Sequence, residues 1–286
     1  MKWLLVLITL LAAALLLVIA CLVGLFLLLA VFSIFAVKGR RKQPGTEQLK
    51  GWNYAHRGLH SAGKPENSMA AFQAALENGC GIELDVHLLQ DGELAIIHDF
   101  DLSRCTNQTG KVESLTAAQL KDCYLEGTGE TIPTLRQVLQ LFDGKAPLII
   151  ELKVAGDNYG RLVDRVMAEL ENYSGVYCLE SFDPRCLSYL KKHYPQVIRG
   201  QLSENYLKSR PKVPMPVWFV MTFLLGNFYF RPDFVAYKYE DRKNIAVFLA
   251  RRLWKMPGVS WTLKTKEEYD QAVSEGWIPI FEGFTP

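Results

Sequence analysis

The sequence has no cysteine pair at the CxxC spacing and no Cys/His cluster of the zinc-binding type. Six cysteines occur, at positions 21, 80, 105, 123, 178 and 186. Because Cys21 lies in a long apolar run, the rest of the chain holds an odd number, five. This usage argues against a zinc site and a disulfide framework. We expect free, mostly buried thiols in a reducing compartment.

Acidic residues are missing from the first 45 positions, which carry five basic residues. The overall net charge of +2 therefore conceals a remainder, residues 46–286, with 27 Lys+Arg against 30 Asp+Glu, or −3. This slightly acidic remainder lacks the basic footprint of a nucleic-acid-binding domain. We expect no nucleic-acid partner.

Residues 3–37 form an uncharged, almost wholly apolar run, far longer than the roughly 20 residues that span a bilayer. One alternative is a secretory signal peptide, whose apolar core has only about 7–15 residues. Another is a bacterial lipoprotein signal at Val18-Ile19-Ala20-Cys21, although sixteen more apolar positions follow that cysteine. We predict an uncleaved, single-pass membrane anchor in residues 1–38 that contacts the bilayer through residues 3–37.

Basic residues flank the apolar run unevenly. Lys38, Arg40, Arg41 and Lys42 follow it, whereas Lys2 alone precedes it. The positive-inside tendency then places the following domain in the cytoplasm. Lys2 in front of the run also suits the opposite orientation.

The rest of the chain alternates short apolar strand candidates with helix-period segments, the pattern of βαβ units around a parallel sheet. Strand candidates lie near 53–56, 81–86, 94–98, 148–152, 176–180, 197–201, 233–238, 259–263 and 278–281. Helix candidates lie near 67–78, 116–122, 134–142, 159–172, 184–193, 242–253 and 266–275. After a polar linker at 39–50, residues 51–286 have the usual size of one (β/α)8 barrel of the TIM type. Nine strand candidates mean that one is wrong or extra, and the turn Gln90-Asp91-Gly92 joins two strands without a full helix.

Residues 213–230 do not fit a plain barrel. This loop insertion is apolar, rich in aromatic residues and uncharged. In one interpretation it is a buried loop and helix that cover the barrel. In the other it is a membrane-facing lid in contact with the same bilayer as the anchor, because exposed apolar patches mark interaction sites.

Three carboxylates suggest a metal site. Glu83 and Asp85 alternate along one predicted strand and so share a face, and Glu151 lies near the end of another apolar strand. Carboxylates on one face repel each other, and a hard divalent cation between them, Mg²⁺ or Ca²⁺, favours oxygen ligands. The alternative is a salt-bridge network with Arg57 or Lys153.

His56 and His98 each end an apolar run on a different strand. One can accept a proton from an attacking water while the other donates one to a leaving alkoxide near neutral pH. Arg57 offers forked, permanently charged donors suited to phosphate oxygens, and Lys153 adds a second positive charge. The other histidines, at positions 60, 87 and 193, we expect to be non-catalytic.

A further pair, Glu66-Asn67, follows the first of these strands after a short loop. Its side chains either bind the metal or cap the next helix, and the structural role is favoured.

Several motifs together resemble the glycerophosphodiester phosphodiesterase family. They are AHRG (55–58), PENS (65–68), IELDVHLLQDGELAIIHD (82–99), LSRCTNQTG (102–110), IPTL (132–135), LIIELK (148–153), SFDP (181–184) and VSWTLKT (259–265). The resemblance implies a (β/α)8 barrel that uses one divalent cation, Mg²⁺ or Ca²⁺, to hydrolyse glycerophosphodiesters to glycerol 3-phosphate and an alcohol. Leu89, Cys105, Lys264 and Phe281-Glu282-Gly283 depart from the family pattern, none of them at a proposed ligand or histidine.

Carried over by position, the resemblance also implies roles for single residues. His56 and His98 match the acid/base histidines, and Arg57 and Lys153 match the phosphate-binding arginine and the active-site lysine. Glu83, Asp85 and Glu151 match the metal ligands, and Trp261 matches a tryptophan in the wall of the substrate pocket.

The leading hypothesis is therefore a membrane-anchored, metal-dependent phosphodiesterase that acts on glycerophosphodiesters. A close alternative is lysophospholipase D-like hydrolysis of lysophospholipids, with residues 213–230 admitting an acyl chain. A third is a membrane-tethered barrel that binds a phosphate ligand or a partner without turning it over. The pattern makes no prediction of oligomeric state.

Overall fold

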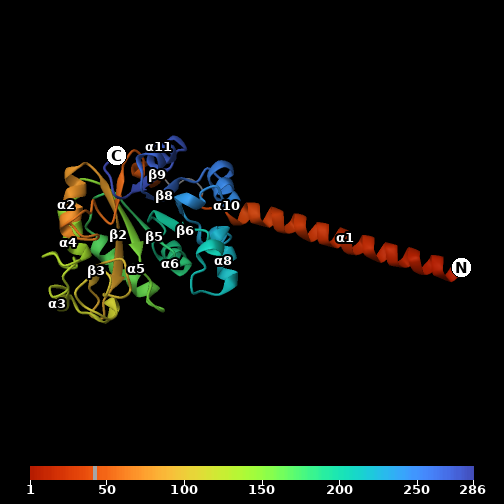
Figure 1. Ribbon diagram of the computed structural model, residues 1–286, viewed down its shortest axis with the longest axis horizontal. Helices are drawn as coiled ribbons and strands as arrows, with labels where there is room; N and C mark the ends of the chain where they lie inside the picture. The colour runs from red at the N-terminus through yellow and green to blue at the C-terminus, as the bar shows by residue number, and fades with distance from the viewer. Residues whose placement is uncertain (41–43) are drawn as a thin grey trace.

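A computed structural model of the chain describes residues 1–40 and 44–286. Eight parallel strands close into a barrel, and helices surround it (Figure 1). The strands are β1 (Tyr54–His56), β2 (Gly81–Leu88), β4 (Leu148–Leu152), β5 (Tyr177–Ser181), β6 (Arg199–Ser203), β7 (Phe234–Lys238), β8 (Gly258–Leu263) and β9 (Ile278–Phe281). Neighbours pair in chain order, and β1 completes the ring by pairing with both β2 and β9. The prediction of a TIM-type (β/α)8 barrel is confirmed.

Of the nine strand candidates, the one near 94–98 is the extra strand. β3 (Leu94–Ile96) pairs antiparallel with β2, with Val86 opposite Ile96 and Leu88 opposite Leu94. The predicted turn at 90–92 joins them as a hairpin, so no crossover helix is needed between them. Because β4 takes the next place beside β2 in the ring, β3 lies outside the barrel.

Several helices around the barrel begin at a residue whose side chain caps them. Ser68 Oγ accepts a hydrogen bond from the Ala71 backbone N–H, Thr134 forms a capping box with Gln137, and Asp183 caps a helix; each satisfies backbone donors at a helix start. The helices are α2 (Met69–Glu77), α3 (Ala117–Leu120), α4 (Leu135–Phe142), α5 (Tyr159–Leu170), α6 (Pro184–His193), α7 (Tyr206–Ser209), α8 (Met215–Thr222), α9 (Asn227–Phe230), α10 (Ile245–Phe248) and α11 (Lys266–Ser274). Short 3₁₀ segments are η1 (Pro44–Leu49), η2 (Val112–Ser114) and η3 (Tyr239–Asp241). The helix predicted at 242–253 is α10 followed directly by η4 (Leu249–Leu253), a π-helical turn.

The barrel interior changes from apolar to polar along the strands. At its base, an apolar cluster includes Leu49 of η1 and Tyr54 of β1, and the Tyr54 hydroxyl donates a hydrogen bond to the Leu49 carbonyl at 2.9 Å. Two positions further on, the side chain on the same face is larger or polar, because strand side chains alternate with a period of two. Such pairs are Tyr54 and His56, Ile149 and Glu151, Cys178 and Glu180, Val259 and Trp261, and Ile280 and Glu282. The carboxyl ends of the strands therefore carry the chemistry.

One long helix projects from the barrel (Figure 1). α1 (Lys2–Ala36) has a mean hydropathy of 3.3 in its most apolar window, and none of that window is buried. By length and composition it is able to cross a membrane, and a signal sequence has the same apolar character. Two of the flanking basic residues, Arg41 and Lys42, lie outside the described residues.

The insertion at 213–230 is buried on one side and exposed on the other. Met221 and Leu224 are buried against the barrel, whereas Met215, Phe219 and Tyr229 are exposed. The Tyr237 hydroxyl donates a hydrogen bond to the Thr222 carbonyl at 2.9 Å, which ties α8 to β7. The segment therefore covers part of the barrel with one side and presents an apolar surface with the other.

Candidate active site

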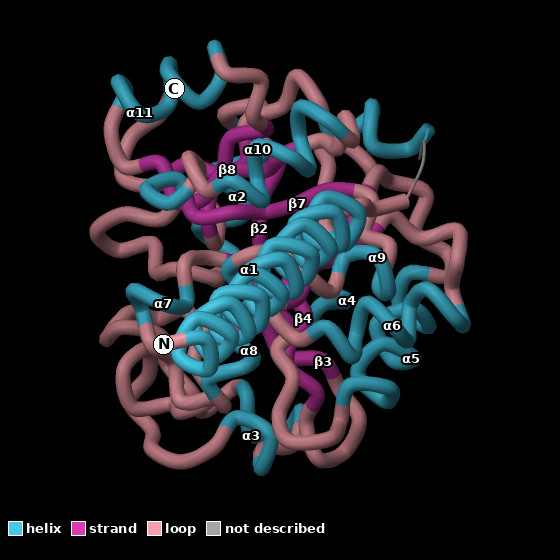
Figure 2. The backbone as a smooth tube through the Cα atoms, turned by 90° about the vertical axis from the view of Figure 1, so that its right-hand side faces the viewer, coloured by secondary structure: helices cyan, strands magenta, loops and turns pink. Residues whose placement is uncertain are grey.

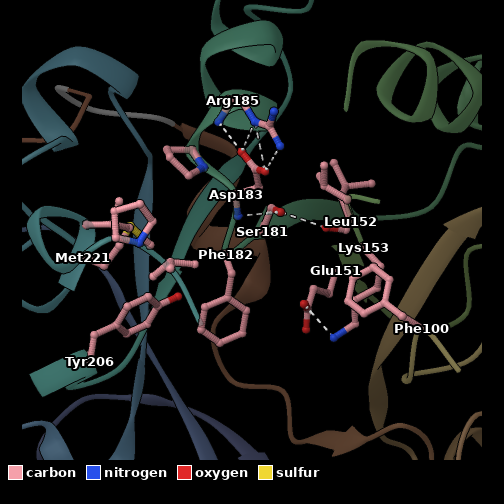
Figure 3. Close-up of a pocket in the computed structure, with 15 residues that line it drawn as sticks. Phe100, Glu151, Leu152, Lys153, Ser181, Phe182, Asp183, Arg185, Tyr206 and Met221 are labelled. Carbon is pink, nitrogen blue, oxygen red and sulfur yellow. Dashed lines mark hydrogen bonds and ion pairs between the residues drawn. The ribbon is translucent and has the colours of Figure 1, made fainter. Parts of the chain in front are cut away.

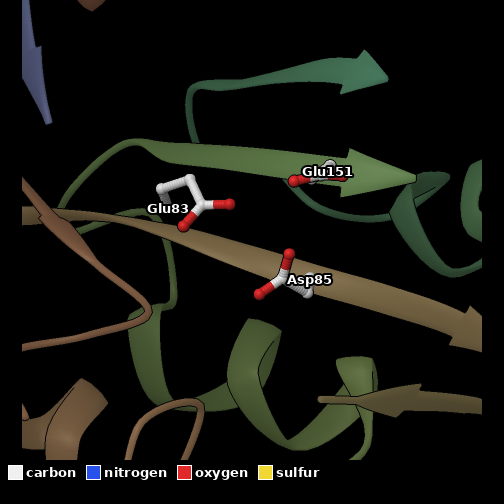
Figure 4. A group of neighbouring side chains, drawn as sticks. All are labelled: Glu83, Asp85 and Glu151. Atoms are coloured by element: carbon white, nitrogen blue, oxygen red, sulfur yellow. The ribbon is translucent and has the colours of Figure 1, made fainter. Parts of the chain in front are cut away.

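Three buried carboxylates meet at the carboxyl end of the barrel. Glu83 and Asp85 lie on β2, and Glu151 lies opposite Asp85 on the neighbouring strand β4 (Figure 4). One oxygen from each lies within 4.8 Å of the others. The shared face of Glu83 and Asp85, predicted from alternation, is thus observed, and strand pairing adds Glu151.

Two cationic side chains reach the same carboxylates. Lys153 Nζ lies 2.9 Å from Asp85 Oδ1 and 2.8 Å from Glu151 Oε1, and Arg57 Nε lies 3.5 Å from Asp85 Oδ2. The backbone N–H of Arg57 donates to Glu83 Oε2 at 3.3 Å. The salt-bridge network that the sequence offered as an alternative therefore exists alongside the carboxylate group.

Among residues 1–40 and 44–286, three carboxylates of this group face two cations, Arg57 and Lys153, so negative charge is in excess. Burial raises the pKa of Glu83 well above its usual value, and repulsion from Asp85 and Glu151 adds to it. Burial also raises the pKa of Glu151, to about 7, although Lys153 opposes the rise. Burial alone would raise the pKa of Asp85 too, but the charges of Lys153 and Arg57 outweigh it and hold that pKa low. Buried, oxygen-rich and short of positive charge, the three residues fit a hard divalent cation.

His56 is held by a carboxylate from the last strand of the barrel. Its Nδ1 lies 2.5 Å from Oε2 of Glu282, just after β9, while its Nε2 faces Glu83 at 3.9 Å. Burial lowers the pKa of His56, and the hydrogen bond to Glu282 partly offsets this. A partner on Nδ1 fixes the orientation of the ring and presents Nε2 to the centre of the site.

His98 has a matching arrangement. Its Nδ1 lies 2.6 Å from Oδ1 of Asp99, and Arg104 donates to the same carboxylate. Burial lowers the pKa of His98 to about 4. His87, predicted to be non-catalytic, lies behind this histidine: its Nδ1 is 2.7 Å from Glu113 and its Nε2 is 3.4 Å from the backbone oxygen of His98.

The turn after β1 positions Arg57. Arg57 and Gly58 both have positive φ, +54° and +83°, a region that favours glycine. A Cβ on Gly58 would also lie 2.9 Å from Ala71 on α2, which excludes larger residues. The AHRG motif is therefore a tight turn pressed against a helix.

Glu66 and Asn67 hold this turn and the metal-site carboxylate rather than capping α2. Glu66 Oε1 accepts hydrogen bonds from Arg57 at 2.9 Å and from Arg104 at 2.7 Å. Asn67 Nδ2 donates to Asp85 Oδ2 at 2.8 Å. The capping role expected for this pair belongs to Ser68 instead.

Two functional candidates were not assigned from the sequence. The sequence marks Glu282 only as a departure from the family pattern. Glu180 on β5 lies opposite Glu151 and is 1% exposed, and its Oε2 has no hydrogen-bond partner among residues 1–40 and 44–286. Burial, with repulsion from Glu151, raises its pKa well above the usual value. The sequence does hold a signal for Glu180: it lies two positions after Cys178 in the strand YCLES, and therefore on the same face as that buried residue.

A pocket of about 590 Å³ opens beside Glu151 and Lys153 (Figure 3). Its walls are mostly apolar and include Phe100, Phe182 and Tyr206, with Val213, Val217 and Met221 from the insertion. Trp261, the predicted wall residue, packs edge-on against Phe182 with ring centroids 5.7 Å apart. The predicted site residues thus gather at one end of the barrel, and the pocket runs from Glu151 and Lys153 to Val217 and Met221 of α8.

Known proteins resemble this chain over most of the residues that form the barrel. Residues 56–281 match the sequence profile of the Glycerophosphoryl diester phosphodiesterase family. A glycerophosphodiester phosphodiesterase of Caldanaerobacter subterraneus subsp. tengcongensis is 32% identical over 234 residues, covering 78% of this chain and 89% of the relative. One of Bacillus altitudinis is 36% identical over 176 residues, covering 55% of this chain and 71% of the relative.

Among solved structures, an Oleispira antarctica phosphodiesterase in complex with the product sn-glycerol-3-phosphate superposes with a TM-score of 0.67 at 22% identity. The match covers 81% of this chain and 92% of that one. It supports the barrel fold.

Proposed function

The chain belongs to the glycerophosphoryl diester phosphodiesterase family and is an enzyme of that type, and we propose that it hydrolyses glycerophosphodiesters to glycerol 3-phosphate and an alcohol with the help of one divalent cation. The observation that carries this proposal is the convergence of Glu83, Asp85 and Glu151 within 4.8 Å, flanked by two carboxylate-held histidines. A protein that only bound a phosphate ligand would have no use for two such histidines, so the third hypothesis loses its support.

In the proposed reaction, water attacks the phosphorus atom, the new P–O bond forms, and the P–O bond to the alcohol breaks. One of His56 and His98 accepts the proton of the attacking water, and the other donates a proton to the departing alkoxide. Arg57, and Lys153 beside it, bind the phosphate oxygens and offset the negative charge that builds up on them. Because Glu282 and Asp99 hold the Nδ1 atoms, each histidine works through Nε2.

Glu83, Asp85 and Glu151 would hold the cation, Mg²⁺ or Ca²⁺. When bound, a divalent cation supplies Lewis-acid polarisation of a phosphate oxygen. Asn67 holds Asp85 in position through its amide, which orients a proposed ligand from outside the metal site.

The test is release of glycerol 3-phosphate from glycerophosphocholine by the purified full chain, with Mg²⁺, with Ca²⁺ and with a chelator. We expect metal-dependent release that is lost in His56→Ala and in Glu83→Ala. Release that persists in either variant, or in excess chelator, would refute the proposed roles. An exposed carboxylate change, Glu267→Gln on α11, is the matched control and should leave the rate unchanged.

We also propose that α1 anchors the enzyme in a membrane with the barrel on the cytoplasmic side, and that residues 39–50 link the two. The length and apolarity of α1 support anchoring, and Lys38 and Arg40 at its barrel end support the orientation. The test is carbonate extraction of membranes that contain the full chain, followed by protease protection of sealed vesicles. A shortened chain or release into the carbonate wash would indicate a cleaved signal sequence.

A second candidate activity is lysophospholipase D-like hydrolysis. The pocket favours it, because apolar side chains from α8 line the path that leads to Glu151 and Lys153. Deleting residues 213–230 would remove Met221 and Leu224, which are buried against the barrel, and could disturb the fold. A single substitution is therefore the better test. Val217→Glu should lower turnover of lysophosphatidylcholine and spare glycerophosphocholine. Equal effects on both substrates would eliminate the acyl-chain path.

A further inference from the structure

The C-terminal end of α1 packs against the barrel domain. Trp254 Nε1 donates a hydrogen bond to the Ile34 carbonyl at 2.7 Å, and the rings of Trp254 and Phe35 lie 5.6 Å apart. Val37 is 1% exposed, and its carbonyl accepts a hydrogen bond from Asn227 at 3.3 Å. The direction in which α1 leaves the barrel is therefore fixed by contacts with Trp254, just after η4, and with α9.

Two separate segments place apolar side chains around this contact between α1 and the barrel. Phe228 of α9 packs edge-on against Phe32 of α1, and α8 precedes it in the same insertion. On the other segment, Ile245 and Phe248 of α10 are 60% and 56% exposed, and Leu253 of η4 is 52% exposed. Viewed from the side of α1, α8, α9 and α10 lie around its base (Figure 2). We call residues 213–230 and 245–255 together the collar.

The chain around the collar is basic, although the domain as a whole is acidic. Residues 205–256 contain ten Lys+Arg and three Asp+Glu, whereas residues 46–286 have a small acidic excess. Two of the three acids, Asp233 and Asp241, are buried. The basic residues include Arg252 and Lys255 beside the exposed Leu253, and all three are exposed. Exposed apolar side chains flanked by Lys and Arg are the composition that binds anionic lipid surfaces.

The length of α1 leads to the same surface. From position 3 to the first contacts with the barrel, near Phe32, the helix has about 29 residues, or roughly 43 Å. A hydrocarbon core of about 30 Å, crossed at a typical tilt of about 20°, takes up only about 21 of them. Lys2 and Trp3 suit the opposite interface. If the barrel were held clear of the membrane, roughly seven or eight apolar residues of α1 would stand in water.

We propose that the collar rests on an anionic bilayer, with Phe228, Ile245, Phe248 and Leu253 in the interfacial zone and the surrounding Lys and Arg among the headgroups. The proposal depends on the membrane anchoring proposed above, and it adds a second contact, through α10 and η4, on the opposite side of α1 from the insertion. The barrel is then bound to the membrane surface in a fixed orientation and does not move freely at the end of α1.

The experiment measures depth with a nitroxide label on the full chain in lipid nanodiscs that contain an anionic phospholipid. The five cysteines of the barrel are buried and Cys21 is exposed, so the background variant is Cys21→Ala. The label is placed by Phe248→Cys in the collar or, as control, by Tyr124→Cys, an exposed aromatic residue just after α3, which lies away from α1 (Figure 1). Collisions with oxygen, which concentrates in the bilayer, are compared with collisions with a water-soluble nickel chelate.

We expect the label at 248 to collide mainly with oxygen, the label at 124 to collide mainly with the nickel chelate, and the contrast to weaken in discs of neutral lipid. If the nickel chelate reaches both labels equally, the barrel stands clear of the membrane and the proposal is wrong. Shielding of the 248 label from both reagents would show that protein covers the collar, which also overturns it. Hydrolysis of glycerophosphocholine, measured on the same samples, reports separately on the proposed activity.

Discussion

The contact between Glu282 and His56 gives the most specific prediction. Replacing Glu282 by Gln keeps the shape of the side chain and removes its charge. The pKa of Glu282 falls to about 2 from its ordinary value of 4.5, chiefly because it accepts the hydrogen bond of His56. By the same coupling, the carboxylate favours the protonated form of His56. Glu282→Gln should therefore lower the pKa of that histidine.

The size of the effect follows from that coupling. A fall in pKa from 4.5 to about 2 corresponds to about 3 kcal/mol between a fully coupled pair. Because the Glu282 side chain is 26% exposed, solvent screening reduces this to about 1–2 kcal/mol. We expect a loss of roughly 5–30-fold in kcat with little change in KM, and a shift of about one unit to lower pH in one limb of the pH–rate profile.

The assay is glycerol 3-phosphate release across the pH range at saturating cation. If His56 is the base, the acid limb moves; if it is the acid, the alkaline limb moves. Asp99→Asn should move the other limb, because Asp99 holds His98. Glu267→Gln is the control for loss of a carboxylate. The reasoning is refuted if Glu282→Gln keeps the wild-type rate and both limbs, or if its defect lies in KM alone.

Three further predictions concern charge and packing. Lys153→Met leaves buried Glu151 without its cation and Asp85 with Arg57 alone. Unfolding in detergent with a chelator should therefore show a loss of roughly 3–5 kcal/mol, and a smaller loss with a divalent cation present; an equal loss in both conditions would contradict this. Glu83→Gln should raise the cation concentration for half-maximal activity by more than the roughly 10–100-fold typical of outer-shell changes, and an unchanged titration would remove Glu83 from the ligands. Gly200→Ala would place a Cβ 2.1 Å from the ring of Phe234 and should destabilise by about 1–3 kcal/mol in chemical unfolding, whereas Gly129→Ala, with open space around it, should stay near wild type.

The strands and much of the site were predictable because they depend on short-range periodicity. The run Leu148–Leu152 is apolar up to Glu151 and was predicted at its observed bounds. The alternation of Glu83 and Asp85 placed two carboxylates on one face before any tertiary contact was known. Helix starts at Ser68, Thr134 and Asp183 follow from local capping chemistry.

The tertiary structure decided which distant groups meet. Glu282 reaches His56 across 226 positions because β9 closes the ring against β1, and no local pattern indicates that pairing. The same holds for Trp254 and Ile34, which seat α1 on the barrel. It also holds for residues 213–230, whose composition is uniform although one side is buried and the other exposed.

The sequence by itself determined the residue types of the site, the strand faces that carry them and the presence of an apolar helix, since each depends on neighbours along the chain. Only the tertiary structure decided that Lys153 reaches Asp85 as well as Glu151, that Glu282 becomes the partner of His56, and that α8, α9 and α10 surround the base of α1. These arrangements depend on packing between segments far apart in the chain, and ring closure fixes them together.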